Sequence, residues 1–507
     1  MPSENSFFDS CQRLTSKGWM AFLLVNLVGL AACSAVPPSE PPALHVPAAF
    51  KEGVPGSSVW QTAQPQDAVP GDWWRLFNDP VLDALQQQAQ QANQNIALAL
   101  ARLRAAHAAL DGSRAAWWPT LGANAASTRS RSSTSSNAST STSASTTAAA
   151  PVNTSATVGL TASWELDVWG RVAAGVRAAQ ANVAASANDV AAMRLSVQAS
   201  VAQTYFAVRA AEAQQRLLAD TLAAYQRSWE LTQNRYRAGV ASSADVAQAH
   251  TQWLAVQAQQ LAAHSSRAQL EHALAVLLGQ APASFTLAVT AELPPPPALP
   301  AQLPAQLLQR RPDIAAAQQR VQAANAQVGV ARAAFFPQLS FSASAGYRAA
   351  QWADVLSAPA LVWSLGPALA ATLFDGGARS AALEQALAGV EQASASYRQT
   401  VLTALQEVED NLVLGASLER EQAVHTEAVA TAQRALVVVE NQYRAGLVGY
   451  LNVLAAQATV LSAHNNLLSV RNRRLAASVV LLKNLAGDWQ PMPSAAGPSP
   501  AAAAAPD

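Results

Sequence analysis

Charged residues are scarce in this chain of 507 residues: they make up 13% of it, and 32 basic residues balance 32 acidic ones. A net charge of zero provides no positive field that would attract nucleic acid. The seven histidines show no metal-ligand spacing, and there is no HExxH motif, phosphate-binding loop or nucleophile elbow. We therefore expect no catalytic residue, no metal site, no cofactor and no nucleic-acid partner.

Cysteine is almost absent as well, because only Cys11 and Cys33 occur. A chain that keeps one cysteine after export has no internal disulfide, so its stability must come from packing and oligomerisation. The sequence Leu-Ala-Ala-Cys that ends at Cys33 resembles a bacterial lipobox, in which the cysteine becomes the lipidated first residue. Ser34 after it, by resemblance to bacterial lipoproteins, indicates sorting to the outer membrane.

Long apolar runs are limited to the N-terminus. Arg13 and Lys17 precede an apolar run from Trp19 to Ala32. A charged start, a short apolar run and small residues before a cleavage point are typical of a secretory signal, which we assign to residues 1–32. A transmembrane anchor is the alternative, since the run reaches about 18 residues if it is extended to Val36.

Proline is missing from two long stretches, Arg171–Ala281 and Ala368–Gln490, and is concentrated in segments between and around them. Proline-rich segments of this kind are linkers or tails. The predicted divisions are a linker at 33–70, a first repeat at 71–281, a connector at 282–304, a second repeat at 305–490 and a disordered tail at 491–507.

Each proline-free stretch contains the same short phrase, at Asn234–Val246 and again at Asn441–Val453. Apolar residues spaced alternately by three and four precede both copies, which places them on one stripe of a helix that must pack against a partner. Glycine readily ends a helix in a left-handed conformation, so Gly239 and Gly446 are predicted to form the tips of two coiled-coil hairpins. The stripes are Leu222, Tyr225, Trp229, Thr232 and Tyr236, and Val429, Ala432, Leu436, Val439 and Tyr443.

Strands are predicted where apolar and small or polar residues alternate, at Leu121–Ala125, Thr157–Val168, Leu339–Tyr347 and Trp363–Leu373. Runs of about ten residues with this pattern are typical of transmembrane β-strands. A soluble sandwich strand is the alternative for any single run. The runs occur in two matching pairs, which favours the transmembrane interpretation.

The two strand pairs differ in their connecting loops. Residues 129–151 are almost wholly Ser, Thr, Ala and Arg, and such a composition is expected to stay solvated. Residues 348–360 form a shorter loop. Four strands cannot close a barrel, whereas two chains would give eight strands with a filled interior and three would give twelve strands with a lumen. We therefore expect a symmetric trimer.

The duplication includes more than the hairpins. The segment Asn95–Leu121 aligns with Asp313–Leu339 from end to end without a gap. The matched pairs include Ile96 with Ile314, Arg102 with Arg320, Arg114 with Arg332 and Pro119 with Pro337.

Four motifs resemble one known family: Asp72–Leu85, Trp164–Arg171, Arg310–Ser344 and Leu373–Ser380. Together with the repeated phrases they are similar to the outer membrane factors, the TolC-like efflux channels, and among them to the NodT-type lipoproteins. The resemblance extends over roughly Trp60 to Trp489.

This resemblance implies a mixed α/β membrane protein: a homotrimer with a twelve-stranded β-barrel, four strands per chain, continuing into a periplasmic α-helical coiled-coil barrel. It implies an outer-membrane channel, held by outer membrane lipid and by an acylated Cys33. The partners would be a periplasmic adaptor (membrane fusion protein) and an inner-membrane pump, often of the resistance-nodulation-division class. Drugs or other small toxic compounds would pass through it without any catalysis.

The resemblance also assigns residues at the two tips. The segments that resemble the adaptor-contact segments of the family contain Arg237, Gly239, Val240, Arg444, Gly446 and Leu447. The alternative is that these are only turn residues.

The closed periplasmic aperture of the family corresponds to Tyr450–Gln457, with Leu451, Asn452 and Ala455. Relatives often have Asp where this chain has Ala455, so a ring of carboxylates is absent at that level. In the first copy Asp245 is a candidate for contacts that hold neighbouring hairpins together. Glu165 and Asp167 are candidates for facing the lumen.

Two other functions stay open. A type I protein-secretion channel would use the same fold. A structural envelope lipoprotein without a pore would explain Cys33 and the coiled-coil spacing, but not the four alternating strands.

Overall fold

The computed structural model describes residues 60–62, 71–131, 152–290, 293–297, 299–301, 311–355 and 357–485. The predicted signal peptide, the lipid-attachment residue Cys33 and the tail at 491–507 lie outside these residues. The chain forms two compact units, and each contains segments of both repeats. The sheet unit includes Ala105–Val183 and Gln319–Ser394, and the helical unit includes Ala184–Gln318 and the chain from Ala395 onward.

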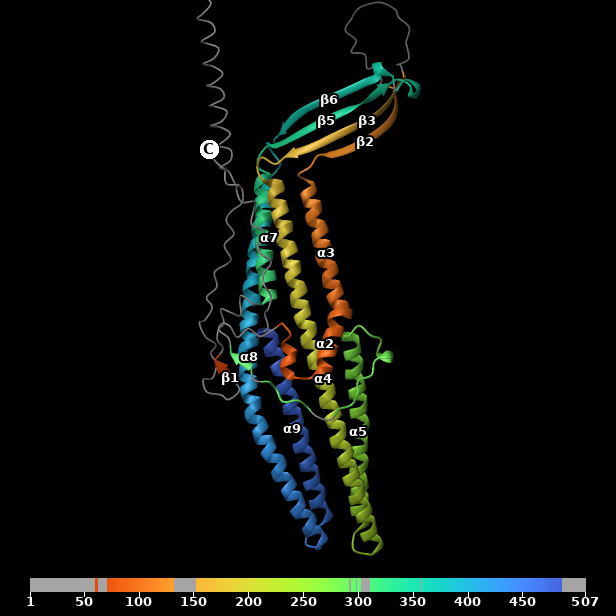
Figure 1. Cartoon of the computed structure of the whole chain (residues 1–507), viewed down its shortest axis with the longest axis vertical. Helices are drawn as coiled ribbons and strands as arrows, with labels where there is room; N and C mark the ends of the chain where they lie inside the picture. The colour runs from red at the N-terminus through yellow and green to blue at the C-terminus, as the bar shows by residue number, and fades with distance from the viewer. Residues whose placement is uncertain are drawn as a thin grey trace, which may run out of the picture. The chain divides into compact units, whose positions relative to one another are not determined.

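Four antiparallel strands form one sheet in the sheet unit (Figure 1). They are β2 (Thr120–Arg131), β3 (Val152–Leu166), β5 (Gln338–Ala349) and β6 (Leu361–Ala370), in the order β2-β3-β5-β6. The two middle strands come from different repeats. The edge strands β2 and β6 are each paired on one side within this sheet.

All four predicted strands are present, but several of their limits were wrong, and β3 runs from Val152 to Leu166 rather than from Thr157 to Val168. Strand β2 continues to Arg131, because Arg129–Arg131 pair in register with Val152–Thr154. The loop predicted from 129 therefore starts after Arg131. Strand β6 ends at Ala370, opposite Gln338, and not at Leu373. Pro337 precedes Gln338 and has no N–H to extend the ladder.

The continuous register gives the sheet two chemically different faces, because paired residues lie on the same face and neighbours in a strand lie on opposite faces. We call the first the apolar face: Leu121, Ala123, Ala125; Val158, Leu160, Ala162, Trp164, Leu166; Leu339, Phe341, Ala343, Ala345, Tyr347; Leu361, Trp363, Leu365, Pro367 and Leu369. The polar face carries mainly Gly, Ser, Thr and Asn, together with Glu165, Gln338 and Arg348.

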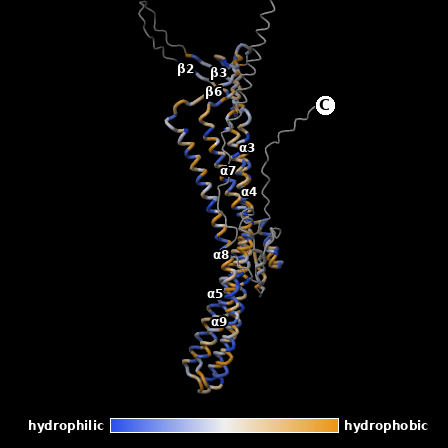
Figure 2. Tube along the Cα trace, turned by 90° about the vertical axis from the view of Figure 1, so that its left-hand side faces the viewer, coloured by the Kyte–Doolittle hydropathy of each residue, from blue (hydrophilic) through white to orange (hydrophobic). Residues whose placement is uncertain are grey.

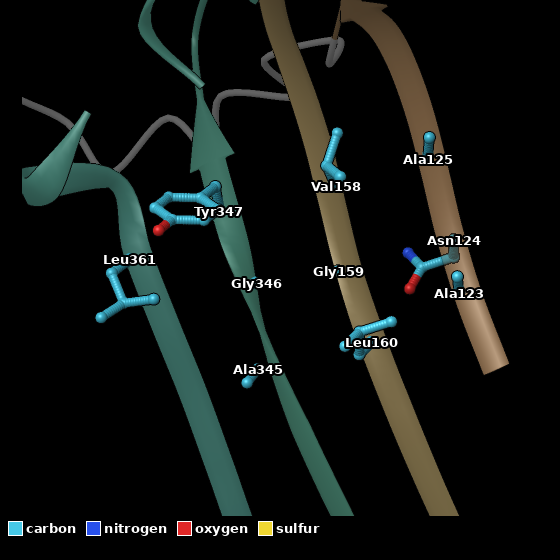
Figure 3. Close-up of a pocket in the computed structure, with 10 residues that line it drawn as sticks. All are labelled: Ala123, Asn124, Ala125, Val158, Gly159, Leu160, Ala345, Gly346, Tyr347 and Leu361. Carbon is cyan, nitrogen blue, oxygen red and sulfur yellow. The ribbon is translucent and has the colours of Figure 1, made fainter. Parts of the chain in front are cut away.

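Two glycines, Gly159 and Gly346, lie opposite each other in the middle strands. A Cβ atom on Gly346 would lie 2.4 Å from the carbonyl oxygen of Val158, so the close approach of the strands requires glycine there. The pair lies at an apolar cavity of about 470 Å³, with Leu160, Tyr347 and Leu361 among its lining residues (Figure 3).

Each repeat has a short helix before its strand pair and a long hairpin after it. The short helices are α3 (Gln94–Ala115) and α7 (Pro312–Ala333), and α2 (Pro80–Ala92) precedes the first of them. The hairpins are α4 (Arg171–Arg237) with α5 (Ser243–Leu277), and α8 (Ala378–Arg444) with α9 (Tyr450–Leu485). Hydrophilic and hydrophobic residues alternate along these helices (Figure 2).

The element lengths repeat, as expected for an internal duplication. Helices α3 and α7 both have 22 residues, and α4 and α8 both have 67. A helix of 67 residues is about 100 Å long. The copies differ in the second strand of each pair, with 15 residues in β3 and 10 in β6, and in the connection between the paired strands. It comprises residues 132–151 in the first copy and only 350–360 in the second.

A large aromatic cluster forms the core of the helical unit. Trp73, Trp74 and Phe77 of the 3-10 helix η1 (Trp73–Phe77) are buried with Tyr205 and Phe206 of α4. Phe77 and Phe206 have ring centroids 4.8 Å apart. The Asp72–Leu85 motif is therefore a packing element.

One segment of the predicted linker and one of the predicted connector form a short sheet. Trp60–Thr62 (β1) pairs in parallel with Leu299–Ala301 (β4). Pro300 is compatible with this two-stranded sheet, since both of its strands are edges. Short 3-10 helices form at Pro282–Ser284 (η2), Trp352–Asp354 (η3) and Ala358–Ala360 (η4).

Candidate functional site: the hairpin tips and the strand-helix junctions

The two tips have the same backbone. Gly239 has φ +74° and Gly446 has φ +78°. The amide of the next residue, Val240 or Leu447, donates to the carbonyl of Arg235 or Gln442, at 2.8 and 2.9 Å. This pattern, with a second bond from each glycine amide, is the Schellman ending of a helix. The predicted turn glycines are confirmed.

The tip side chains are exposed. Val240 is 66% exposed and Leu447 is 76% exposed. Arg237 donates to Asn234, and Arg444 makes a long ion pair of 3.7 Å with Glu440. Both tips therefore present one apolar side chain and one arginine, a composition suited to a protein partner.

Three of the four aperture candidates lie at the start of α9 and are exposed, and the fourth, Asp245, lies at the start of α5. Leu451 is 61% exposed, and Asn452 and Ala455 are exposed on the same first turns. The Asp245 carboxylate accepts from the backbone and hydroxyl of Ser242, while its own amide donates to that hydroxyl. Asp245 thus forms the capping box of α5. Its predicted contact with a neighbouring hairpin stays a prediction.

The tips also bind each other within one chain, which the sequence did not predict. The Arg235 guanidinium lies 4.5 Å from the ring centroid of Tyr443 and donates to the Tyr443 carbonyl at 3.2 Å. The hydroxyls of Ser228 and Tyr450 are 3.2 Å apart. Burial raises the pKa of Tyr450, although the bond with Ser228 lowers it in part. The sequence feature that could have indicated this contact is the difference between Arg235 and Gln442, which occupy the same position in the two similar phrases.

Three aromatic rings stack above the first tip: Trp229, His250 and Trp253, with centroids 4.7 to 5.7 Å apart. They join α4 to α5. Trp229 belongs to the predicted stripe, and Tyr225 and Thr232 of that stripe are buried as expected. Tyr236 is 49% exposed, so the stripe ends before it.

The predicted lumen candidates sit where strand β3 meets helix α4. Glu165 binds Arg171 and accepts from Gln338 of the neighbouring strand. Asp167 accepts from the amides of Val172 and Ala173 at 2.9 and 2.8 Å. These contacts fix the junction. Whether either carboxylate faces a lumen stays a prediction.

The second junction has an equivalent cap. Asp375 accepts from the amides of Gly377 and Arg379 and from the Arg379 side chain. The Arg379 hydrogen bond lowers the pKa of Asp375, and the Gly377 amide adds to this. Gly376 and Gly377 have φ of +65° and +94°, as a turn there requires.

A buried ion cluster fastens the connector to the first hairpin. Glu212 accepts from Arg209 at 2.8 Å and from Arg267 at 2.9 Å, and the amide of Thr290 donates to it at 3.2 Å. Arg267 also pairs with Glu271. Sequence reasoning missed this cluster, because its members are far apart in the chain.

Two features are absent from the described residues. None of the helices there is both long and apolar enough to cross a membrane. No group of three His, Cys, Asp or Glu side chains in the same part of the chain could hold a metal ion.

The sequence matches the model of the outer membrane efflux protein family over residues 85–280 and 303–487. It is 32% identical to the probable efflux pump outer membrane protein TtgC of Pseudomonas putida, over 92% of this chain and 95% of that protein. It is 34% identical to the pyoverdine export outer membrane protein OpmQ of Pseudomonas aeruginosa, over 88% of this chain and 94% of that one.

Solved structures agree. The outer-membrane channel OprN superposes with a TM-score of 0.78 at 28% identity, covering 89% of this chain and 99% of that chain. The outer membrane protein VceC of Vibrio cholerae gives 0.72 at 30% identity, covering 82% and 98%. The chain belongs to the outer membrane efflux protein family, and it is an outer-membrane efflux channel protein.

Proposed function

We propose that three copies of this chain close one twelve-stranded barrel, through which small organic compounds leave the cell. The observation that carries this proposal is the sheet itself. It has an apolar face along all four strands and two edge strands, β2 and β6, each with one side unpaired among the described residues. Unpaired edges in lipid leave backbone groups without partners, so they must be closed. Joining β6 of one copy to β2 of the next does this and keeps the strands antiparallel.

Substrates reach this conduit from a periplasmic adaptor and an inner-membrane pump. Relatives carry names that refer to efflux pumps and, in one case, to the export of pyoverdine. We propose a pump of the resistance-nodulation-division class and a substrate range of drugs, solvents or similar small molecules. Cys33 is the proposed site of acylation, and mass spectrometry that finds an uncleaved signal would contradict it.

The residues at the hairpin tips have two further proposed roles, adaptor docking and closure of the pore. Arg237, Val240, Arg444 and Leu447 are exposed beside the turn glycines, which supports adaptor docking there. Leu451 is exposed on α9, which supports a constriction of three leucines, one from each copy. Such an apolar ring closes a pore by excluding water.

The barrel is tested by placing a charge on either face of β3. Leu160 lies on the apolar face near the middle of the strand, and Thr161 next to it lies on the polar face. An arginine that faces lipid at the bilayer midplane costs about 2–4 kcal/mol, whereas one in a water-filled lumen does not. We expect Leu160→Arg to lower the yield of membrane-inserted protein at least tenfold and Thr161→Arg to leave it near that of the wild type.

The readout is the fraction of chain that resists urea extraction from outer membranes. Thr161→Arg is the matched control, since it adds the same side chain at the adjacent position. Equal losses for the two variants would contradict the membrane placement of this sheet.

A further inference from the structure

Two arginines lie where the apolar face ends, at the outer end of β2 and opposite the start of β3. Strand β2 has no bulge, so Arg129 and Arg131 share a face with Leu121, Ala123 and Ala125. Both arginines are exposed. Within the described residues, neither has an ion-pair partner.

The position of these arginines matches the edge of a bilayer. The apolar face extends along β3 from Leu166 back to Ala156, ten residues earlier in the chain. Ten residues span about 34 Å along a strand, or about 25 Å in height at a tilt of 45°, which is the height of the apolar band of a membrane barrel. Arg129 pairs with Thr154, just beyond this band.

Negative charge is scarce in the surrounding sequence. Between Trp117 and Trp164 the charged residues are Arg129 and Arg131 alone. Between Gln338 and Ala370 they are Arg348 and Asp354. Three arginines against one aspartate give the outer end of the sheet a net positive charge, which favours a ligand of opposite charge on the membrane side.

We propose that Arg129 and Arg131 bind the phosphate groups of phosphorylated lipids in the outer leaflet, whose acyl chains cover the apolar face. Guanidinium groups bind phosphate bidentately, and two of them at alternate positions of one strand can hold one phosphorylated headgroup. The neighbouring apolar side chains accept the lipid tail, so the site recognises headgroup and chain together. This inference rests on the proposed barrel.

The test uses the full chain, purified as its assembly in detergent and titrated with fluorescent bisphosphorylated lipid A in mixed micelles. Each basic residue near a membrane surface contributes about 1 kcal/mol, or about fivefold. We expect Arg129→Ser/Arg131→Ser to weaken binding about twenty-five-fold. Arg348→Ser is the matched control, because Arg348 lies on the polar face at the same end of the sheet. It should leave binding unchanged.

Two further probes separate the possible sources of phosphate. Dephosphorylated lipid A should bind the wild type as weakly as the double variant does. Millimolar inorganic phosphate should not displace the lipid, since it lacks an acyl chain; displacement would show a free-anion site and overturn the proposal. Equal binding by the wild type and the double variant, or an equal loss in Arg348→Ser, would overturn it as well.

Assembly mass and single-channel conductance are recorded on the same samples. A monomeric, non-conducting wild type contradicts the proposed channel and this inference with it. A conducting trimer whose lipid binding ignores Arg129 and Arg131 contradicts this inference alone.

Discussion

The two copies within this chain share their backbone and differ in what their side chains contact. Both tips end in the same Schellman turn, yet Tyr236 is 49% exposed and its counterpart Tyr443 is 8% exposed. Tyr443 is buried because Arg235 of the first copy lies over its ring and Tyr450 packs against that ring edge-on. The counterpart of Arg235 is Gln442, which carries no charge to place over Tyr236. Two unmatched residues, Arg235 and Tyr450, thus turn a repeated tip into an asymmetric pair.

The starts of the short helices α3 and α7 also share their backbone and differ in their side-chain contacts. In the second copy Arg311 pairs with Asp313 at 2.7 Å and with Glu407 at 3.1 Å. In the first copy Asn93 and Asn95 take the positions of Arg311 and Asp313. The Asn93 side chain caps α3 and donates to the carbonyl of Leu277 at 2.7 Å. One copy uses charge and the other uses neutral hydrogen bonds for the same task.

The largest effect is expected where the copies are identical. Replacing Gly239 and Gly446 together by valine should abolish efflux, because β-branched residues at positive φ cost about 1–3 kcal/mol each and distort the docking turn. The measurement is drug resistance in cells that carry equal amounts of each variant. The matched control replaces both glycines by asparagine, which tolerates this conformation. Full resistance in the valine variant, with normal expression, would remove the tips from the docking site.

Breaking the charged helix start should cost more than breaking the neutral one. Arg311→Ala leaves a part-buried Asp313 without its cation and should lower the free energy of unfolding by about 2 kcal/mol. Asn93→Ala loses neutral hydrogen bonds and should cost about 1 kcal/mol. Guanidinium titration followed by circular dichroism of the helices compares them. A larger loss in Asn93→Ala would reverse the comparison.

Of the two helix starts, acid should weaken only that of the second copy. Burial raises the pKa of Asp313, but hydrogen bonds and the charge of Arg311 lower it more, so the pKa lies below its usual range. A carboxyl with a depressed pKa stabilises the fold above its unfolded pKa, about 3.9, and loses this contribution as the pH falls further. The stability gap between the wild type and Asp313→Asn should therefore be constant above about pH 5 and close below about pH 4. If the stability difference persists at low pH, it arises from packing and not from the charge of Asp313.

The smallest effect concerns the aperture. Leu451 occupies the position of Ala244 in the first copy. Leu451→Ser should wet the proposed constriction and raise single-channel conductance in planar bilayers, whereas Ala244→Ser should not. Trivalent cations on the periplasmic side should block the wild type poorly, and Ala455→Asp should create a block. Strong block of the wild type would point to another carboxylate, with Asp245 the first to replace.

Local patterns predicted the elements, and long-range contacts explain what they missed. Alternation located all four strands, because one face is apolar at every second residue. It could not place the end of β6, which depends on Pro337 before the neighbouring strand β5. Glycine within the repeated phrase located both tips. No local pattern predicts that Ser228 contacts Tyr450, which lies 222 residues away in the sequence.

The residues of the candidate site also divide into those that local patterns could predict and those that depend on long-range contacts. Exposure of Val240, Leu447 and Leu451 was implied by their place beside a turn. The cap made by Asp245 could have been found from Ser242, the third residue before it, since that spacing is the signature of a capping box. The buried Glu212 cluster could not have been found in this way, because Glu212 has partners in α5 and in the connector, far away in the sequence.

The central claim is that the sheet of one chain is a third of a barrel. Native mass spectrometry of the purified full chain in detergent, with conductance recorded from the same preparation, tests it most directly. We predict a species of three chains that forms water-filled channels. A monomer or a dimer that conducts, or a trimer that does not, would contradict the account.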